Sequence, residues 1–197
     1  MRKPGLPATA LALLFLTAPI VQAANLPRPA PEFVINLAPG KSIKLSQYKG
    51  KTVVVAFILT YCSHCQKSIG FLTKDQQEFG PRGLQVLASA IDAPTAVPGF
   101  ILQFNPPFPV GFNTNEEAMG FMQHVPMMTS YMPMIAFIDK DGVVRAQYEG
   151  NDPFLSEGVQ ERNLRDKIEE LLKPATPGKK TVTKNKGAAA TAKKQSN

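Results

Sequence analysis

An uninterrupted apolar run covers residues 53–59, VVVAFIL, and is rich in β-branched and aromatic side chains. A run of this length and composition predicts a central strand that is buried on both faces. Polar residues follow at once, and residues 66–79 then place Ile69, Leu72 and Phe79 at helical spacing. The pattern therefore predicts a buried strand that leads directly into an amphipathic helix.

The remaining pattern alternates between strands and helices before it ends in a hairpin. Apolar runs predict strands at 42–45, 84–91, 108–112, 134–138 and 143–148, and helical spacing predicts helices at 99–104, 116–123 and 157–172. Residues 139–142, DKDG, predict a tight turn with a positive φ at Gly142. We therefore expect an α/β fold, a central mixed β-sheet flanked by helices, with a parallel pair of strands at its centre.

The two ends of the chain differ from this pattern. Residues 1–23 combine a basic start with an apolar stretch and small residues, which predicts a secretory signal cleaved after Ala23; an uncleaved membrane anchor is the alternative. Residues 25–31 are proline-rich and predict an extended lead-in that need not pack. Residues 174–197 are rich in lysine, alanine and threonine without aromatic residues, which predicts a disordered tail. The folded domain is expected at 24–173.

The formal charge of +7 is concentrated at these ends. Arg2, Lys3 and six lysines after Pro174 contribute eight positive charges, which leaves −1 for the rest of the chain. A domain with that charge has no electrostatic footprint for a nucleic acid, so we expect no nucleic-acid partner. The basic tail predicts at most weak contact with an anionic membrane surface, and its ordinary interpretation is a solvated segment.

The only two cysteines, Cys62 and Cys65, lie where the predicted strand gives way to the helix. Cys62 is therefore expected at a helix N-terminus, where unpaired N–H groups and the helix dipole stabilise the reactive thiolate. The spacing lets the two sulfurs reach each other. A disulfide that closes so short a loop stabilises a fold only weakly, so a purely structural disulfide is the weaker interpretation. We predict a redox-active disulfide, Cys62–Cys65, with no other cofactor and no resident metal, in a periplasmic or otherwise exported protein that is soluble after cleavage of the signal.

At this point two stretches can be compared with a known family. APEFVINLAPGKSIKLSQYKGKTVVVAFILTYCSHC, followed by YMPMIAFIDKDGVV, resembles the thioredoxin-like proteins of the TlpA and ResA type, exported thiol-disulfide oxidoreductases of the redoxin and AhpC/TSA-like superfamily. The resemblance spans about residues 31–172. It implies a thioredoxin-like fold with an N-terminal β extension, and it implies that Pro133 is a cis proline beside the cysteine pair.

The sequence also departs from this family. Tyr61 stands where tryptophan is usual, and Ser68 and Gly70 stand where the family's helix often carries glutamate and proline. The strand acid typical of thioredoxin falls on Ala56. Without these carboxylates no residue is assigned as the proton acceptor of the second thiol. His64, the second residue between the cysteines, is similar to the motif of the oxidase DsbA, in which histidine favours the thiolate.

These residues lead to one functional hypothesis. Cys62 is expected to act as the nucleophile and Cys65 as the resolving thiol, through a mixed disulfide with a protein thiol or disulfide. His64 is expected to tune the pair, although an exposed polar residue without that role is the alternative. Tyr61, Met132 and Pro133 are expected to bind substrate, the last two through a backbone lip opposite Cys62. An upstream redox partner is also implied, with electrons flowing either to or from the client protein.

Two other functions fit parts of the pattern. Six of the seven methionines lie between residues 119 and 134 together with His124, and thioether, thiolate and imidazole are ligands that copper(I) selects. A copper(I)-delivery protein similar in fold to the Sco type is therefore the alternative, against the simpler interpretation of core methionines and an adaptable groove. A peroxiredoxin is disfavoured, because Val55 and Leu59 occupy the places of its proline and its threonine or serine.

Overall fold

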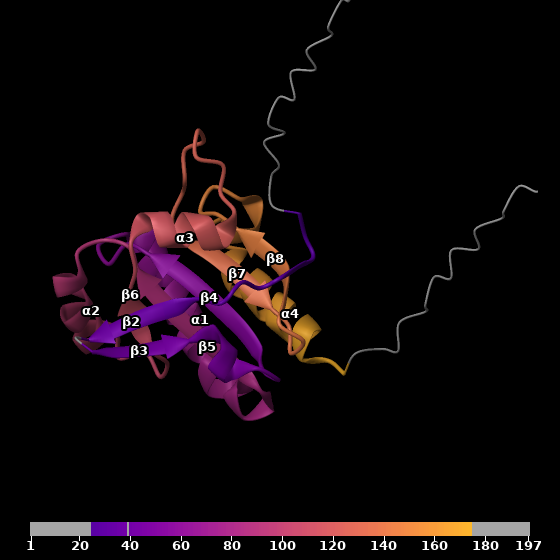
Figure 1. Ribbon diagram of the computed structural model, residues 1–197. Coiled ribbons are helices and arrows are strands. Elements are labelled where there is room, and N and C mark those ends of the chain that lie inside the picture. Colours follow the sequence, from indigo (N-terminus) through magenta and orange to yellow (C-terminus); the bar gives the residue numbers. More distant parts are fainter. Residues whose placement is uncertain (1–24, 39, 175–197) are drawn as a thin grey trace, which may run out of the picture.

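The computed structural model describes residues 25–38 and 40–174, which form an eight-stranded mixed β-sheet with helices on both faces (Figure 1). The order of strands across the sheet is β1-β8-β7-β4-β5-β6-β2-β3. The strands are β1 (Arg28–Pro29), β2 (Val34–Ala38), β3 (Lys41–Lys44), β4 (Thr52–Ile58), β5 (Leu84–Ala90), β6 (Val110–Phe112), β7 (Met134–Ile138) and β8 (Val143–Tyr148). The α-helices are α1 (Ser63–Phe79), α2 (Val97–Phe104), α3 (Asn115–Met122) and α4 (Gln160–Leu172).

The predicted central strand, β4, is buried along its whole length. Alternate residues face opposite sides of the sheet. Val54, Ala56 and Ile58 pack in one core with α1, α2 and α4, whereas Val53, Val55 and Phe57 pack in a second core with α3. Burial on both faces explains why this strand is apolar without interruption.

The strand register gathers three loops at one edge of the sheet. β4, β5 and β6 are parallel to one another, with Ile58 opposite Ala90, so β4 and β5 both end at this edge. β7 is antiparallel to β4 and its first residue, Met134, pairs with Phe57, so β7 begins there. The cysteine segment, the residues after β5 and the segment around Pro133 therefore meet at the same edge.

Most predicted elements are confirmed, with boundaries shifted by a few residues. The hairpin of β7 and β8 turns at Gly142, where φ is +78°, as the DKDG sequence predicts. The predicted helix at 157–172 begins later, at Gln160, because a short 3-10 helix (Pro153–Leu155) and a turn at Gly158 precede it. The predicted signal at residues 1–23 and the predicted tail from residue 175 lie outside the described residues.

The prediction that the lead-in at 25–31 need not pack was wrong. Residues 28–29 form β1 on the edge of β8, and Arg28 is only 7% exposed. Its guanidinium donates to the carbonyl oxygen of Phe121 at 2.6 Å and to Oε1 of Gln147 at 3.0 Å. A cation at the last carbonyls of α3 is favourable, and this contact draws the segment onto the fold.

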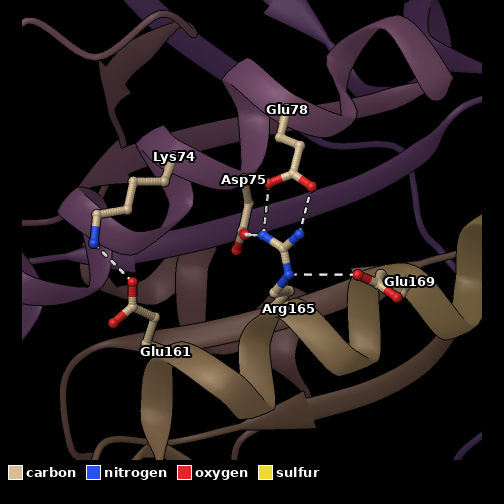
Figure 2. A network of polar contacts seen from close by, with 6 residues as sticks. All are labelled: Lys74, Asp75, Glu78, Glu161, Arg165 and Glu169. Atoms are coloured by element: carbon tan, nitrogen blue, oxygen red, sulfur yellow. Dashed lines mark hydrogen bonds and ion pairs between the residues drawn. The ribbon is translucent and has the colours of Figure 1, made fainter.

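Helix α4 is fastened to α1 by an ionic network (Figure 2). Arg165 on α4 donates two hydrogen bonds to Glu78 on α1 and lies 3.7 Å from a carboxylate oxygen of the buried Asp75. The network comprises Lys74, Asp75, Glu78, Glu161, Arg165 and Glu169. The network therefore fixes α4 against α1, the helix that begins after Cys62 and contains Cys65. Between residues 25 and 174, no helix has both the length and the apolar character needed to cross a bilayer.

Candidate active site

Cys62 lies at the N-cap of α1, as predicted. The preceding residues form a turn in which the N–H of Cys62 donates to the carbonyl oxygen of Leu59 at 3.1 Å. Cys62 itself is half-buried and extended, with φ −77° and ψ 116°, and its Sγ accepts a hydrogen bond from the N–H of Cys65 at 3.3 Å. The sulfur therefore lies at the N-terminal end of α1 and accepts a backbone N–H from the first turn of that helix.

Cys65 lies behind the first cysteine and is fully buried. Burial, followed by the hydrogen bond with Cys62, raises the pKa of the Cys65 thiol well above its ordinary value. Both cysteines are free thiols in this structure. The pair is thus asymmetric, because one sulfur is accessible and supported by backbone donors while the other is sequestered and protonated.

His64 is anchored to the fold by one ring nitrogen. Its Nε2 lies 2.8 Å from the carbonyl oxygen of Leu155. Since a carbonyl only accepts, Nε2 carries a proton and donates. This bond fixes the ring between α1 and the 3-10 helix before α4, so the side chain is not a free surface group; its effect on the cysteine pair stays a prediction.

Ser68, at the family's glutamate position, belongs to a buried polar pair. Its hydroxyl donates to the carbonyl oxygen of His64 at 2.9 Å and accepts from Nε2 of Gln160 at 2.5 Å. Ser68 is fully buried and Gln160 is 3% exposed. Sequence reasoning missed Gln160, which lies 92 positions away, although an isolated polar residue on the inner side of the last helix was a signal. The pair is neutral and provides no carboxylate for proton transfer.

The predicted substrate lip lies at the same edge of the sheet. The Met132–Pro133 peptide bond is cis, as the resemblance implies, and Pro133 is buried. Gly150 packs against this segment: its N–H donates to the carbonyl oxygen of Tyr131 at 2.9 Å. A Cβ at position 150 would lie 2.2 Å from the carbonyl oxygen of Met132, so only glycine fits there. Tyr61, beside Cys62, is 74% exposed.

The methionines divide into two groups. Met122 and Met134 are buried in the core, and Met119 is packed against it, which confirms the core interpretation for these three. Met127 and Met128 are 94% and 65% exposed on the segment between α3 and β7, which rises above the rest of the fold in Figure 1. The predicted site therefore has two exposed thioethers near its lip.

His124 anchors the base of this methionine-bearing segment. Its Nδ1 lies 2.7 Å from a carboxylate oxygen of Glu149, and its Nε2 lies 3.0 Å from the carbonyl oxygen of Met128. The hydrogen bond to Met128, assisted by Glu149, raises the pKa of His124. Because both partners only accept, both ring nitrogens donate in this arrangement. Neither nitrogen is free to bind a metal ion unless a bond is broken.

The sequence matches the AhpC/TSA family over residues 26–147. The chain belongs to the AhpC/TSA family. Among its relatives in this family is the thiol-disulfide oxidoreductase ResA of Bacillus thuringiensis, which is 30% identical over 149 residues, 75% of this chain and 77% of the relative. ResA of Bacillus subtilis is 29% identical over 104 residues, 52% of this chain and 58% of the relative. The resemblance expected from the CSHC and YMP motifs is confirmed.

Solved structures show the same fold. A thiol:disulfide interchange protein of the thioredoxin family from Chlorobium tepidum superposes with a TM-score of 0.63 at 22% identity, covering 77% of this chain and all of that chain. A thiol:disulfide interchange protein from a Bacteroides species gives a TM-score of 0.62 at 19% identity, over 81% and 97% of the two chains. This family member therefore has the thioredoxin-like fold that the motifs implied.

Proposed function

We propose that this protein exchanges disulfides with protein thiols through Cys62, with Cys65 as the resolving thiol. The observation that carries the proposal is the asymmetry of the pair. Cys62 is partly accessible and accepts an N–H from its own helix, whereas Cys65 is fully buried and its pKa is raised. An attacking sulfur needs access and thiolate character, and a resolving sulfur needs to stay inert until the first has reacted.

The proposed reaction conserves electrons and protons. In the reducing direction the Cys62 thiolate attacks one sulfur of a client disulfide, a mixed disulfide forms, and the other client sulfur leaves as a thiolate. That leaving thiolate is the proton acceptor we propose for Cys65, since among the described residues no carboxylate is hydrogen-bonded to either cysteine. Deprotonated Cys65 attacks Cys62 and the Cys62–Cys65 disulfide forms. The client sulfur that was bound to Cys62 leaves as a thiolate and takes a proton from solvent, so the client has gained two electrons and two protons. The oxidising direction reverses these steps.

The surroundings of the pair fit a protein client. Met132 and Pro133 provide a backbone lip at the edge where Cys62 lies, and an extended client segment would pair with the peptide groups of Met132. Beside the lip is a hollow of about 660 Å³, lined among others by Met128, Tyr131 and Tyr148. Methionine side chains adapt to different apolar surfaces, which suits a permissive client site. His64 and Tyr61 complete the proposed site.

Export and partners are also proposals. Residues 1–23 support secretion to the periplasm or another exported compartment, where a thiol pair meets client disulfides. After each cycle an upstream redox partner must restore the pair, in whichever direction electrons flow. The lysine-rich tail offers weak contact with an anionic membrane surface.

Copper(I) delivery is the second candidate. Met127 and Met128 favour it, because they expose thioethers on the segment that precedes Met132 and Pro133. Against it, His124 already uses both ring nitrogens. Among the described residues, moreover, no group of three or more histidine, cysteine, aspartate or glutamate side chains is arranged to hold a metal ion. Titration of the reduced protein with copper(I), compared with Met127→Ala and Met128→Ala, separates the candidates: tight binding lost in both variants favours delivery.

The exchange function is tested by turnover. Reduced protein is mixed with a disulfide-containing client protein and a regenerating thiol, and client reduction is followed over time. We expect turnover by the wild type and none above background by Cys62→Ser, with the fold of the variant checked by circular dichroism. Undiminished turnover by a folded Cys62→Ser variant contradicts the proposal.

A further inference from the structure

The turn that leads into Cys62 is held by a carboxylate outside the sequence motifs. Asp92 follows the end of β5, and its Oδ2 accepts two hydrogen bonds from Thr60. One comes from the backbone N–H at 3.0 Å, and the other comes from the hydroxyl. Asp92 thus accepts from both hydrogen-bond donors of Thr60, which lies two positions before Cys62.

The same residue is also held from the helix side. Nε2 of Gln66, in the first turn of α1, donates to the carbonyl oxygen of Thr60 at 2.8 Å. All three polar groups of Thr60 are therefore paired, two with the sheet edge and one with the helix. The β4–β5 ladder continues to the residue before Asp92, because the N–H of Ile91 donates to Ile58 at 2.9 Å. Asp92 is consequently fixed relative to the sheet, and through Thr60 it fixes the turn.

The other carboxylate oxygen shows that the arrangement is costly. Oδ1 of Asp92 is buried and has no hydrogen-bond partner among the described residues. A buried carboxylate oxygen without a donor lowers stability. The fold keeps a carboxylate at a place where one of its oxygens is unsatisfied. Within residues 25–38 and 40–174, the other oxygen accepts only from Thr60, in the turn before Cys62. Such exceptions point to a role at a functional site.

We propose that Asp92 is a positioning residue for disulfide exchange, acting through Thr60. The inference rests on the proposed role of Cys62. A sulfur gains from backbone donors only while it lies in line with them. The N–H of Cys65 donates to Sγ of Cys62 at 3.3 Å, an ordinary distance for a sulfur acceptor, and the turn in which Cys62 N–H donates to Leu59 sets the direction of the Cys62 side chain. Release of Thr60 lets this turn move, which weakens the support of the thiolate.

The test measures the reactivity of Cys62 with iodoacetamide as a function of pH, in a Cys65→Ser background so that one thiol reacts. Asp92→Ala removes both hydrogen bonds to Thr60, and Thr60→Val removes the one from the hydroxyl. We expect each to slow alkylation at pH 7 by about threefold to tenfold and to move the pH–rate profile to higher pH, since aligned helix-end interactions have this order of magnitude. Asp92→Asn and Thr60→Ser keep an acceptor and a hydroxyl, and we expect rates within about twofold of the parent.

A matched control comes from the opposite end of β7. Asp139 also ties a turn with its carboxylate, accepting from the N–H groups of Asp141 and Val143 at 2.9 and 3.0 Å. Asp139→Ala is expected to lower stability and to leave the alkylation profile unchanged. If Asp92→Ala fails to fold, Thr60→Val decides, because it removes only a hydroxyl and preserves shape.

Two results overturn the inference. One is a parental profile in Asp92→Ala or Thr60→Val. The other is an Asp92→Asn rate as low as that of Asp92→Ala, which would show that the charge rather than the hydrogen bonds matters. Iodoacetamide reports on Cys62 without a protein client. Failure of the proposed exchange function, seen in turnover, therefore remains distinct from failure of the positioning role.

Discussion

Replacement of Asp75 by asparagine is expected to stabilise the protein at neutral and alkaline pH. Asp75 is 4% exposed, and its Oδ2 has no partner among the described residues. The facing Arg165 stays 3.7 Å away, beyond hydrogen-bond distance, because it donates to Glu78 instead (Figure 2). Burial raises the pKa of Asp75 from 3.8 to about 6, and the attraction of Arg165 offsets only part of this effect.

The raised pKa sets the sign and the magnitude. The folded state binds the Asp75 proton more tightly than the unfolded state does. The contribution of Asp75 to stability is therefore fully present below about pH 4 and is lost as the pH rises through about 6. The interval between the two pKa values corresponds to about 3 kcal/mol of unfolding free energy. The new amide also lies unpaired beside Arg165, which reduces this gain. We therefore expect Asp75→Asn to raise the free energy of unfolding by about 1 to 3 kcal/mol at pH 8.

The assay is urea denaturation of wild type and Asp75→Asn at intervals from pH 4 to pH 8. The difference in unfolding free energy should be near zero at pH 4, should widen up to about pH 6 and should then stay constant. Asp139→Asn is the opposite case. Burial raises the pKa of Asp139, but hydrogen bonds from the N–H of Val143 and from Arg145 outweigh burial, so the pKa of Asp139 is lowered in the folded state. That variant should be less stable than wild type above pH 4. A difference for Asp75→Asn that is absent at pH 8, or equal at pH 4 and pH 8, refutes the reasoning.

Two further predictions concern the proposed substrate lip and the segment that precedes it. Gly150→Ala places a methyl group against the carbonyl oxygen that precedes the cis proline, so we expect a loss of about 1 to 3 kcal/mol in urea denaturation and slower turnover; Gly120→Ala, with open space around it, should cost nothing. The hydrogen bond to Met128 and the carboxylate of Glu149 raise the pKa of His124 in the folded state. The contribution of His124 to stability is therefore full below about pH 6.5 and is lost as the pH rises through that raised pKa. NMR titration of the imidazole should show a midpoint above that of free histidine, and a midpoint at or below it would contradict this.

The sequence was sufficient for the parts of the fold that depend on local pattern. The apolar run of β4 and the CSHC segment placed Cys62 at the start of α1, because a buried strand followed by helical spacing allows few alternatives. The DKDG turn likewise specified the hairpin. These features are local in the chain, and composition and periodicity report on local features.

Contacts between distant residues could not be predicted in this way. Gln160 reaches Ser68 across 92 positions, and Arg28 reaches Phe121 across 93. Each is a single polar residue whose partner depends on tertiary packing. The periodicity of apolar residues along the chain does not indicate which partner it will be. The clamp of Asp92 on Thr60 belongs to the same class, because β5 must first pair with β4 before the two residues meet.

The most direct test of the central claim is to trap the reaction halfway. Reduced Cys65→Ser is mixed with an oxidised client protein, the products are alkylated, and the mixed disulfide is located by mass spectrometry after digestion without reductant. We expect a stable adduct on Cys62, formed in high yield, because the sulfur that would release the client is missing. Absence of this adduct, or an equally stable adduct on Cys65 in the Cys62→Ser variant, contradicts the assignment of attacking and resolving thiols.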